Sequence, residues 1–352
     1  MIGLPTYEDT AVSSPVLKHV DLELTRKCNL GCVHCSSGLQ TEGNELSLSE
    51  EKKILKEAKS LGLKAVGLTG GEPFLRLRKL TRLVDFCRDE IDARVHIHSN
   101  GTRIFRREAR WVKQSEVDIT VSFFGSDPRT HDAITNRTGS MKSALRGLRN
   151  LLDVKANLTV FVVPMRSNSR EIPSLIELIN EEGVEDVRIL LPSPTGRALH
   201  RFDELKLTDE QVQWLRKELV RVQTERDIHL RAGFCTRLDF PDLEVLKGHD
   251  RCYAAENRLH IDAFGNVYPC TASSGRIVFS AGNVQMPGYT LAEIWRFSPL
   301  FQFLRRFHSN PPEKCQACVK FRNCMSGCRV KISYGYGDVT VADPRCRGPY
   351  LE

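Results

Sequence analysis

Three closely spaced cysteines are the strongest chemical signal in this chain: Cys28, Cys32 and Cys35, in the order C-x3-C-x2-C. Thiolates are soft ligands that select iron–sulfur clusters or zinc over harder metals. A [4Fe–4S] cluster is normally held by four cysteine thiolates, so three would leave one iron without a protein ligand. The spacing therefore predicts a cluster with an open coordination site. A zinc site that lacks its fourth ligand, or cysteines buried as small apolar residues, are the alternatives.

A second group of cysteines lies in the last third of the chain. Two of them flank a glycine in the order C-x12-G-x4-C, four follow as C-x2-C-x5-C-x3-C, and one more lies near the end. Such half-sites can complete a tetrahedral zinc site, but seven thiolates behind the N-terminal triplet favour iron–sulfur clusters. The seven are Cys252, Cys270, Cys315, Cys318, Cys324, Cys328 and Cys346. Cys235 precedes them, whereas Cys87 fits a buried position in a predicted helix.

Composition places the chain among ordinary soluble globular proteins, with 352 residues of which 41% are hydrophobic and 27% charged. No signal sequence and no apolar stretch of about 18 residues is present, so we expect a cytoplasmic protein without a membrane partner. Twelve cysteines in a reducing compartment favour metal ligation over disulfides. The net charge is +7, and the basic residues between 76 and 113 fit a solvated face. Such a face could also steer an acidic peptide or a reduced flavodoxin, and nucleic acid is less favoured because no RNA-recognition motif accompanies the charge.

Short apolar or β-branched runs alternate with amphipathic stretches of helical period, which predicts strand–helix units around a parallel sheet. The first helix has a capping-box start at Ser47–Glu50. Six units fall short of the eight in a complete barrel, so we predict an α/β fold with a partial (β/α)6 barrel of the TIM type, open on one side. The strands are predicted at residues 19–24, 65–68, 95–98, 118–122, 158–163 and 187–191.

Beyond residue 232 this alternation stops, and cysteines, glycines and prolines become dense. We therefore predict a barrel domain over residues 1–232 and a small cysteine-rich α+β domain over residues 233–352. Within the second domain, Leu259–Cys270 is predicted to form a β-hairpin that turns at Gly265-Asn266.

Four candidate site segments follow predicted strands, and the carboxyl ends of parallel strands meet at one face of a barrel. The cysteine triplet follows the first strand, and Gly70–Pro73 (Gly-Gly-Glu-Pro) follows the second. Glycines let backbone groups approach a ligand closely, and Glu72 offers a carboxylate for an ammonium group. Ser99 and Asn100 follow the third strand and Ser122 ends the fourth, where their polar groups can contact a ligand or simply cap the strands.

The cysteine triplet together with Gly-Gly-Glu-Pro one strand later resembles the radical S-adenosylmethionine superfamily. In that family the open iron is chelated by the amino and carboxylate groups of S-adenosylmethionine, and an electron passed to the sulfonium yields a 5′-deoxyadenosyl radical. The resemblance implies that the Gly-Gly-Glu-Pro segment binds the cofactor's amino group. It also implies ribose or carboxylate contacts from the later segments, although Arg137 fits a surface arginine equally well. The cofactor-binding residues expected on this basis are Gly70, Gly71, Glu72, Pro73, Ser99, Asn100, Ser122 and Arg137.

His34 and Phe124 are two further positions that bear on the resemblance to this family. His34 lies between two cluster ligands, and we expect it to pack against the cluster or the adenine. Phe124 stands where relatives often have Asp, which puts an acidic contact there in doubt but not the fold.

The C-terminal cysteines closely resemble the seven-cysteine SPASM domain, which follows the barrel in many peptide-modifying members of the family. The resemblance assigns Cys315, Cys318, Cys324 and Cys346 to a fully ligated outer cluster, and Cys252, Cys270 and Cys328 to an inner one. The inner cluster is then one thiolate short, and our hypothesis is that Cys235 completes it; an open iron or a non-cysteine ligand is the alternative. Three [4Fe–4S] clusters are therefore expected, one that binds S-adenosylmethionine and two auxiliary ones.

The resemblance implies an enzyme that abstracts hydrogen from an unactivated carbon of a peptide, which leads to a cross-link, an oxidation or a backbone rearrangement. No general base is assigned. About 18 residues precede the first predicted strand, too few for a fused leader-peptide-binding domain, so a peptide substrate would need a separate recognition protein or a short docking mode. A flavodoxin- or ferredoxin-type reductant is expected as well. The alternative within the family is oxidation or decarboxylation of a tetrapyrrole or other small molecule, as in alternative haem synthesis. A zinc-stabilised scaffold that binds RNA or protein is the alternative from another class.

Overall fold

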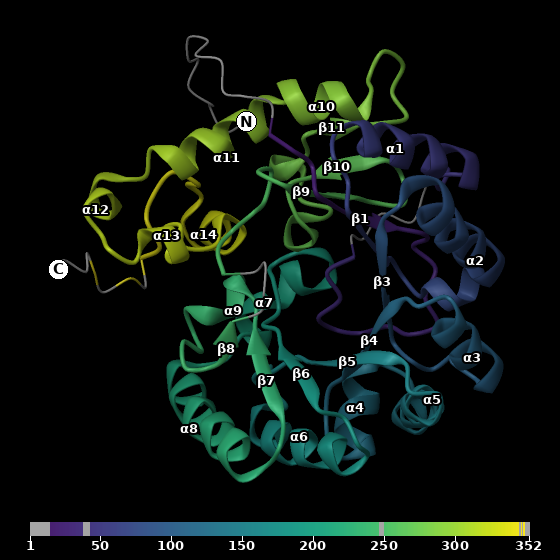
Figure 1. Cartoon of the computed structure of the whole chain (residues 1–352). Coiled ribbons are helices and arrows are strands. Elements are labelled where there is room, and N and C mark those ends of the chain that lie inside the picture. Colours follow the sequence, from purple (N-terminus) through teal and green to yellow (C-terminus); the bar gives the residue numbers. More distant parts are fainter. Residues whose placement is uncertain (1–14, 38–42, 246–249, 345, 347, 349–352) are drawn as a thin grey trace.

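The computed structural model describes residues 15–37, 43–245, 250–344, 346 and 348. Six parallel strands coincide with the predicted ones and lie in sequence order across a curved sheet (Figure 1). They are β1 (His19–Glu23), β2 (Ala65–Thr69), β3 (Arg94–Ser99), β4 (Asp118–Phe123), β5 (Asn157–Val162) and β6 (Asp186–Ile189). The predicted partial barrel is therefore confirmed.

Two short strands that were not predicted continue the sheet in parallel beyond β6: β7 (His229–Ala232) and β8 (Glu244–Val245). The predicted boundary at residue 232 falls between them. The division into two domains at that residue stays a prediction.

Helices lie on the outside of the curved sheet and cover its apolar face (Figure 1). The predicted capping box of the first helix is confirmed, because the Ser47 hydroxyl accepts from the Glu50 N–H while the Glu50 carboxylate accepts from the Ser47 N–H. Cys87 is buried, as predicted, at the start of the π-helical turn η2 (Cys87–Ile91). The helices of this part are α1 (Leu48–Ser60), α2 (Leu77–Phe86), α3 (Arg106–Gln114), α4 (Pro128–Thr135), α5 (Ser140–Asp153), α6 (Ile172–Glu181), α7 (Phe202–Leu205), α8 (Asp209–Glu225) and α9 (Phe234–Arg237), with 3₁₀ turns η1 (Pro73–Arg76), η3 (Ser169–Glu171) and η4 (Gly196–Arg201).

The C-terminal part joins the same sheet beside β1. Strand β9 (Arg258–Ile261) pairs in parallel with β1 and antiparallel with β10 (Asn266–Tyr268), which confirms the predicted hairpin. Its turn contains Gly265 at a φ of +80°. Strand β11 (Gly282–Asn283), the 3₁₀ turns η5 (Thr271–Ser273) and η6 (Ile277–Phe279), and the helices α10 (Leu291–Phe297), α11 (Pro299–Ser309), α12 (Glu313–Gln316), α13 (Phe321–Cys324) and α14 (Arg329–Tyr336) complete this part.

The strand order β11-β10-β9-β1-β2-β3-β4-β5-β6-β7-β8 places β1 between the hairpin and β2. The segment after β1, which contains the cysteine triplet, is thereby flanked by the Gly-Gly-Glu-Pro segment on one side and by the hairpin on the other. None of the helices in the described part of the chain has the length and apolar character needed to cross a membrane.

Candidate active site and cluster-binding cysteines

The segment after β2 lies directly against the chain that leads into the cysteine triplet. The Gly71 N–H donates to the Thr25 carbonyl at 2.6 Å, and the Glu72 N–H donates to the Lys27 carbonyl at 2.8 Å. A Cβ on Gly71 would lie 2.1 Å from the Lys27 carbonyl oxygen, and one on Gly70, at a φ of +133°, would lie 2.4 Å from that of Thr25. Both positions therefore require glycine, because the absence of a side chain lets the backbone of the cysteine segment approach closely.

Glu72 is buried at this junction, and three donors hold its carboxylate. Oε1 accepts from the Phe74 N–H at 3.1 Å and from the Ser99 hydroxyl at 2.8 Å, while Oε2 accepts from the Asn100 N–H at 2.8 Å. Burial raises the pKa of Glu72 to about 7, although these hydrogen bonds oppose the shift. Within the described residues Glu72 forms no ion pair, although the charge of Arg103 lowers its pKa, so this buried carboxylate gains from a ligand that brings an amino group.

Ser99 and Asn100 link this glutamate to the cysteine segment. The Ser99 hydroxyl is bound to Glu72, and the Asn100 Nδ2 lies 3.8 Å from the Cys28 sulfur and 3.1 Å from the Asn29 Oδ1. Both side chains thus orient the site from within the protein. Contact of either with the cofactor's ribose stays a prediction.

Ser122 and Arg137 lie at two other places around the cysteine segment. Ser122, at the end of β4, is half-buried. Arg137 is exposed beside a shallow hollow at α4, and follows Thr135, whose carbonyl accepts from the Gly31 N–H at 2.8 Å. The structure therefore brings the Arg137 segment to the cysteine triplet, and its pairing with a cofactor carboxylate stays a prediction.

An apolar cluster lies on one side of the cysteine segment. The His34 ring packs on the buried Phe124 ring with centroids 4.6 Å apart, and the His131 ring lies 5.3 Å from Phe124 on another side. Burial lowers the pKa of His34 to about 4, so its imidazole is neutral at pH 7. Cys32 packs on this group of apolar side chains, whose buried members are Phe124, Ile134, Val163, Met165, Ala198 and Leu205. Phe124 thus supplies an apolar wall where relatives often have a carboxylate.

Two residues after β6 hold the cysteine segment from another side, and sequence reasoning missed both. The Arg197 Nε donates to the Cys32 carbonyl at 2.9 Å, and its N–H donates to the Cys35 carbonyl at 3.0 Å. Gly196 has a φ of +54°, and a Cβ there would lie 2.4 Å from the Cys35 carbonyl oxygen. The available signal was the Pro-Thr-Gly-Arg sequence at residues 194–197, shortly after the strand predicted at residues 187–191.

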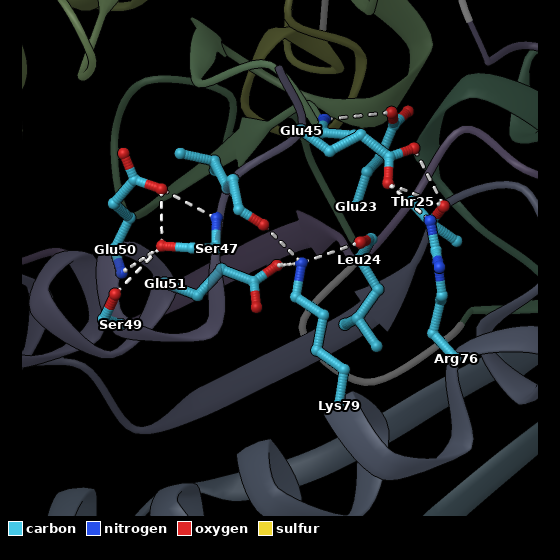
Figure 2. A network of polar contacts seen from close by, with 12 residues as sticks. Glu23, Leu24, Thr25, Glu45, Ser47, Ser49, Glu50, Glu51, Arg76 and Lys79 are labelled. Atoms are coloured by element: carbon cyan, nitrogen blue, oxygen red, sulfur yellow. Dashed lines mark hydrogen bonds and ion pairs between the residues drawn. The ribbon is translucent and has the colours of Figure 1, made fainter.

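Glu45 fixes the backbone at the end of β1 (Figure 2). Its carboxylate accepts from the Thr25 hydroxyl at 2.9 Å and from the Arg26 N–H at 2.8 Å, and it pairs with Arg76 at 3.4 Å. These contacts hold the chain immediately before the cysteine triplet.

Lys79 makes a second clamp on the same chain (Figure 2). Its Nζ donates to the Leu24 carbonyl at 3.0 Å and the Leu46 carbonyl at 2.6 Å, and pairs with Glu51 at 2.8 Å. Burial raises the pKa of Glu51 to about 8, and the Lys79 cation opposes that shift. Helices α1 and α2 are thereby tied to the start of the cysteine segment.

The inner group of C-terminal cysteines is brought together with Cys235. The Cys235 and Cys328 sulfurs lie 3.8 Å apart. The hydrogen bond to Cys328 and burial raise the pKa of Cys235, and the charges of Cys270 and Cys252 raise it further. Cys235 therefore lies beside Cys328, and the charges of two further thiols act on it. That these four cysteines ligate the inner cluster stays a prediction.

Three cysteines of the outer group interact through their charges. Burial raises the pKa of Cys324, and the charges of Cys346 and Cys315 add to that shift. The Cys318 N–H donates to the Cys315 carbonyl at 3.3 Å. Within the described residues, no three His, Cys, Asp or Glu side chains converge as the ligands of a single metal ion do. Cluster ligands bind different irons and need not converge in this way.

A buried arginine, Arg329, interacts with cysteines of both the inner and the outer group, and its surroundings show whether this part of the chain fits negatively charged iron–sulfur clusters. Arg329 is 6% exposed and donates to the Val339 carbonyl at 2.9 Å and the Val341 carbonyl at 2.6 Å. Burial lowers its pKa, and the opposing negative charges come from Cys328, Cys252, Asp343 and Cys315. A buried cation needs compensating charge, which clusters held by thiolates would supply. The residues present therefore fit iron–sulfur clusters.

Comparison with known proteins agrees with this geometry. The profile of the Radical SAM superfamily matches residues 22–179, and that of the SPASM iron–sulfur cluster-binding domain matches residues 252–319. The chain belongs to the radical S-adenosylmethionine superfamily, in its branch with a C-terminal SPASM domain, and it is an enzyme. The cofactors of this class are [4Fe–4S] clusters and S-adenosylmethionine.

Among individual proteins, the chain is 31% identical to mycofactocin maturase MftC of Mycolicibacterium smegmatis, over 92% of this chain and 81% of the relative. It is 27% identical to the AdoMet-dependent heme synthase of Nitratidesulfovibrio vulgaris, over 98% of this chain and 95% of the relative. In fold it is similar to Streptococcus suis SuiB bound to precursor peptide SuiA, with a TM-score of 0.75, 18% identity, and coverage of 96% of this chain and 76% of that one.

Proposed function

We propose that this radical S-adenosylmethionine enzyme acts on a peptide and forms a cross-link, oxidises a residue or rearranges the backbone. The observation that carries the proposal is the joining of the Cys28 segment, the buried Glu72 and the cysteine-rich C-terminal part through one sheet. The similarity to a mycofactocin maturase over both parts supports a peptide substrate, and the fold shared with peptide-bound SuiB is in keeping with it.

The chain's own residues bind and orient the cofactors. Cys28, Cys32 and Cys35 would hold the first [4Fe–4S] cluster, and Glu72 would accept hydrogen bonds from the amino group of S-adenosylmethionine. When bound, these groups supply the 5′-deoxyadenosyl radical that removes hydrogen from the substrate. Asn100 directs its amide toward the Cys28 sulfur and stabilises negative charge there.

Two surfaces then exclude water and retain the cofactor. The apolar wall of Phe124 and His34 keeps one side of the cysteine segment dry. Arg137 would pair with the cofactor's carboxylate, since a guanidinium offers two parallel donors to a carboxylate. Ser122 would donate its hydroxyl to the ribose or the carboxylate.

The C-terminal cysteines would hold two auxiliary [4Fe–4S] clusters, with Cys235 as a ligand of the inner one. Such clusters take up single electrons, which suits a reaction in which a substrate radical must be oxidised to reach product. A separate protein would recognise the peptide's leader, a flavodoxin- or ferredoxin-type protein would supply electrons, and the reducing cytoplasm would keep the thiols available.

The test is cofactor cleavage by anaerobically reconstituted enzyme. We expect 5′-deoxyadenosine to form under reduction, with formation stimulated by a precursor peptide encoded near the enzyme and accompanied by a mass change in that peptide. A variant with Cys28, Cys32 and Cys35 all replaced by Ala should lose both products. Stimulation by no peptide, together with cleavage stimulated by a tetrapyrrole, would overturn the proposal.

A tetrapyrrole substrate is the second candidate, because the similarity to a heme synthase extends over 98% of the chain. This function predicts that an iron–porphyrin precursor binds the cofactor-loaded enzyme and loses carbon dioxide from its propionates. Absorbance titration with that precursor separates the two candidates before any product is analysed.

A further inference from the structure

An exposed aromatic ring on the outer rim of the barrel is surrounded by arginines. Phe105, at the start of α3, is 43% exposed. The Arg146 guanidinium, from α5, lies 4.3 Å from the ring centroid, and that of Arg103 lies 5.9 Å from it. Arg106 and Arg110 are exposed one turn apart on α3 and extend the basic surface. These five residues are called the arginine face below.

In the described part of the chain no carboxylate forms an ion pair with the arginine face, although the charge of Arg103 acts on the buried Glu72. Arg103, Arg106, Arg110 and Arg146 form no ion pair there, and Glu108, the acidic residue of α3, is buried and pairs with the adjacent Arg107. An uncompensated cluster of guanidinium groups attracts an acidic surface and raises the rate of encounter with it.

A chain of polar contacts leads from the arginine face to the first cysteine. Arg146 donates to the Thr102 carbonyl at 2.8 Å, and the Thr102 hydroxyl accepts from the Asn29 amide at 2.8 Å. The Asn29 Oδ1 accepts from the Asn100 amide at 3.1 Å, and that amide lies 3.8 Å from the Cys28 sulfur. Cys28 is also the exposed member of the triplet. The arginine face is thus the outer surface next to the first cluster site.

The auxiliary cysteines lie elsewhere. In Figure 1, α3 and α5 lie on the opposite side of the molecule from α12 and α13, which contain Cys315 and Cys324 of the outer cysteine group. A partner on the arginine face would therefore approach the first cluster site and not the auxiliary ones.

We propose that the arginine face is the docking surface of an acidic one-electron donor protein of the flavodoxin or ferredoxin type. The inference rests on the proposed function, which requires such a donor. In the step, the donor's reduced flavin or iron–sulfur centre loses one electron, and the cluster held by Cys28, Cys32 and Cys35 gains it; no covalent bond forms or breaks. A substrate peptide must instead reach the carboxyl ends of the strands, so an acidic peptide on this outer surface is an alternative outcome of the test.

Binding to the cofactor-free protein is the first measurement. The variant Arg106→Glu/Arg110→Glu reverses two charges of the arginine face. The control Lys217→Glu/Arg226→Glu makes the same change in net charge on α8 and at the residue that follows it. At low ionic strength we expect the first variant to bind an acidic bacterial flavodoxin about tenfold more weakly than the wild type, and the control to bind as the wild type does. The difference should shrink in 1 M salt, where charges are screened beyond about 3 Å.

Reduction of the loaded protein is the second measurement. Flavodoxin hydroquinone should reduce the first cluster about tenfold more slowly in the arginine-face variant, whereas dithionite should reduce it at the wild-type rate. Equal flavodoxin binding by all three proteins, an equal loss with dithionite, or binding of an acidic peptide in place of flavodoxin would overturn the docking surface. If no substrate stimulates cofactor cleavage while flavodoxin binding still depends on these arginines, the docking surface stands and the proposed function fails.

Discussion

Replacing Gly71 by alanine should displace the cysteine segment without adding strain to the backbone of Gly71 itself. The new Cβ would lie 2.1 Å from the Lys27 carbonyl oxygen, and ordinary contact begins near 3.4 Å, so the two chains must separate by about 1.3 Å. That movement breaks the hydrogen bonds from Gly71 to Thr25 and from Glu72 to Lys27. The lost bonds cost about 1 kcal/mol each, and overpacking adds about 1–3 kcal/mol.

Because Cys28 follows Lys27 directly, the same movement carries a predicted cluster ligand away from its partners. We expect Gly71→Ala to lose about four irons per chain after anaerobic reconstitution, the same loss that we expect of the variant in which Cys28, Cys32 and Cys35 are replaced by Ala. Binding of S-adenosylmethionine should fall with the iron, while the auxiliary cluster spectra persist.

Gly335→Ala is the matched control, because a Cβ at Gly335 meets no atom within 4 Å and no positive φ is imposed there. Its iron content should equal that of the wild type. Wild-type iron and cofactor affinity in Gly71→Ala would refute the argument that the close approach of these two backbones fixes the site.

Three further predictions concern single side chains. Burial raises the pKa of Glu72 from 4.5 in the unfolded chain to about 7, so the folded state binds the Glu72 proton more tightly. The contribution of this proton to folding stability is complete below pH 4.5 and is lost as the pH rises through 7. The free energy of unfolding of the cofactor-free protein should therefore fall by up to about 3 kcal/mol over this pH range, which thermal unfolding at a series of pH values measures. Glu72→Gln should flatten the dependence of stability on pH. An unchanged dependence in that variant would contradict the assignment of the titrating group to Glu72. Cys235→Ala should lower the iron content by about four per chain or change the spectrum of the inner cluster, whereas unaltered iron and spectra would leave the inner cluster with an open iron or another ligand. Arg329→Met should make the auxiliary clusters harder to reduce by on the order of 1–2 kcal/mol per electron. The measurement is a potentiometric titration followed by electron paramagnetic resonance, in which Arg329→Lys should retain most of the wild-type reduction potential. Equal potentials in all three proteins would show that the Arg329 cation does not compensate the negative charge of the clusters.

The strands that could be predicted from the sequence are those whose apolar pattern is long enough to be periodic. Strands β1 to β6 span four to six residues and lie within apolar or β-branched runs of the sequence, and each was found. Strand β8 has only two residues, too few for a period to stand out. Strand β7 is as long as β6, but its sequence His-Leu-Arg-Ala contains only two apolar residues. Both strands are paired by hydrogen bonds with their neighbours.

The same distinction holds within the site. Cysteines and Gly-Gly-Glu-Pro could be predicted because their chemistry is local in the sequence. The role of Arg197 could not, since its contacts to Cys32 and Cys35 join residues more than 160 positions apart. Phe124 was recognised only as a departure from the family pattern, and the packing of His34 on Phe124 became apparent only in the folded chain.

The pairing of β1 with β9 has a consequence for synthesis of the protein. β1 ends at Glu23, whereas the strand that covers one of its edges begins only at Arg258, so β1 leaves the ribosome long before its partner strand is made. Until that residue is made, β1 exposes a row of unpaired N–H and C=O groups, and pairing over so long a separation is slow. Truncation before β9 should therefore yield an aggregation-prone chain, and a nascent chain of that length needs chaperones to protect the open edge.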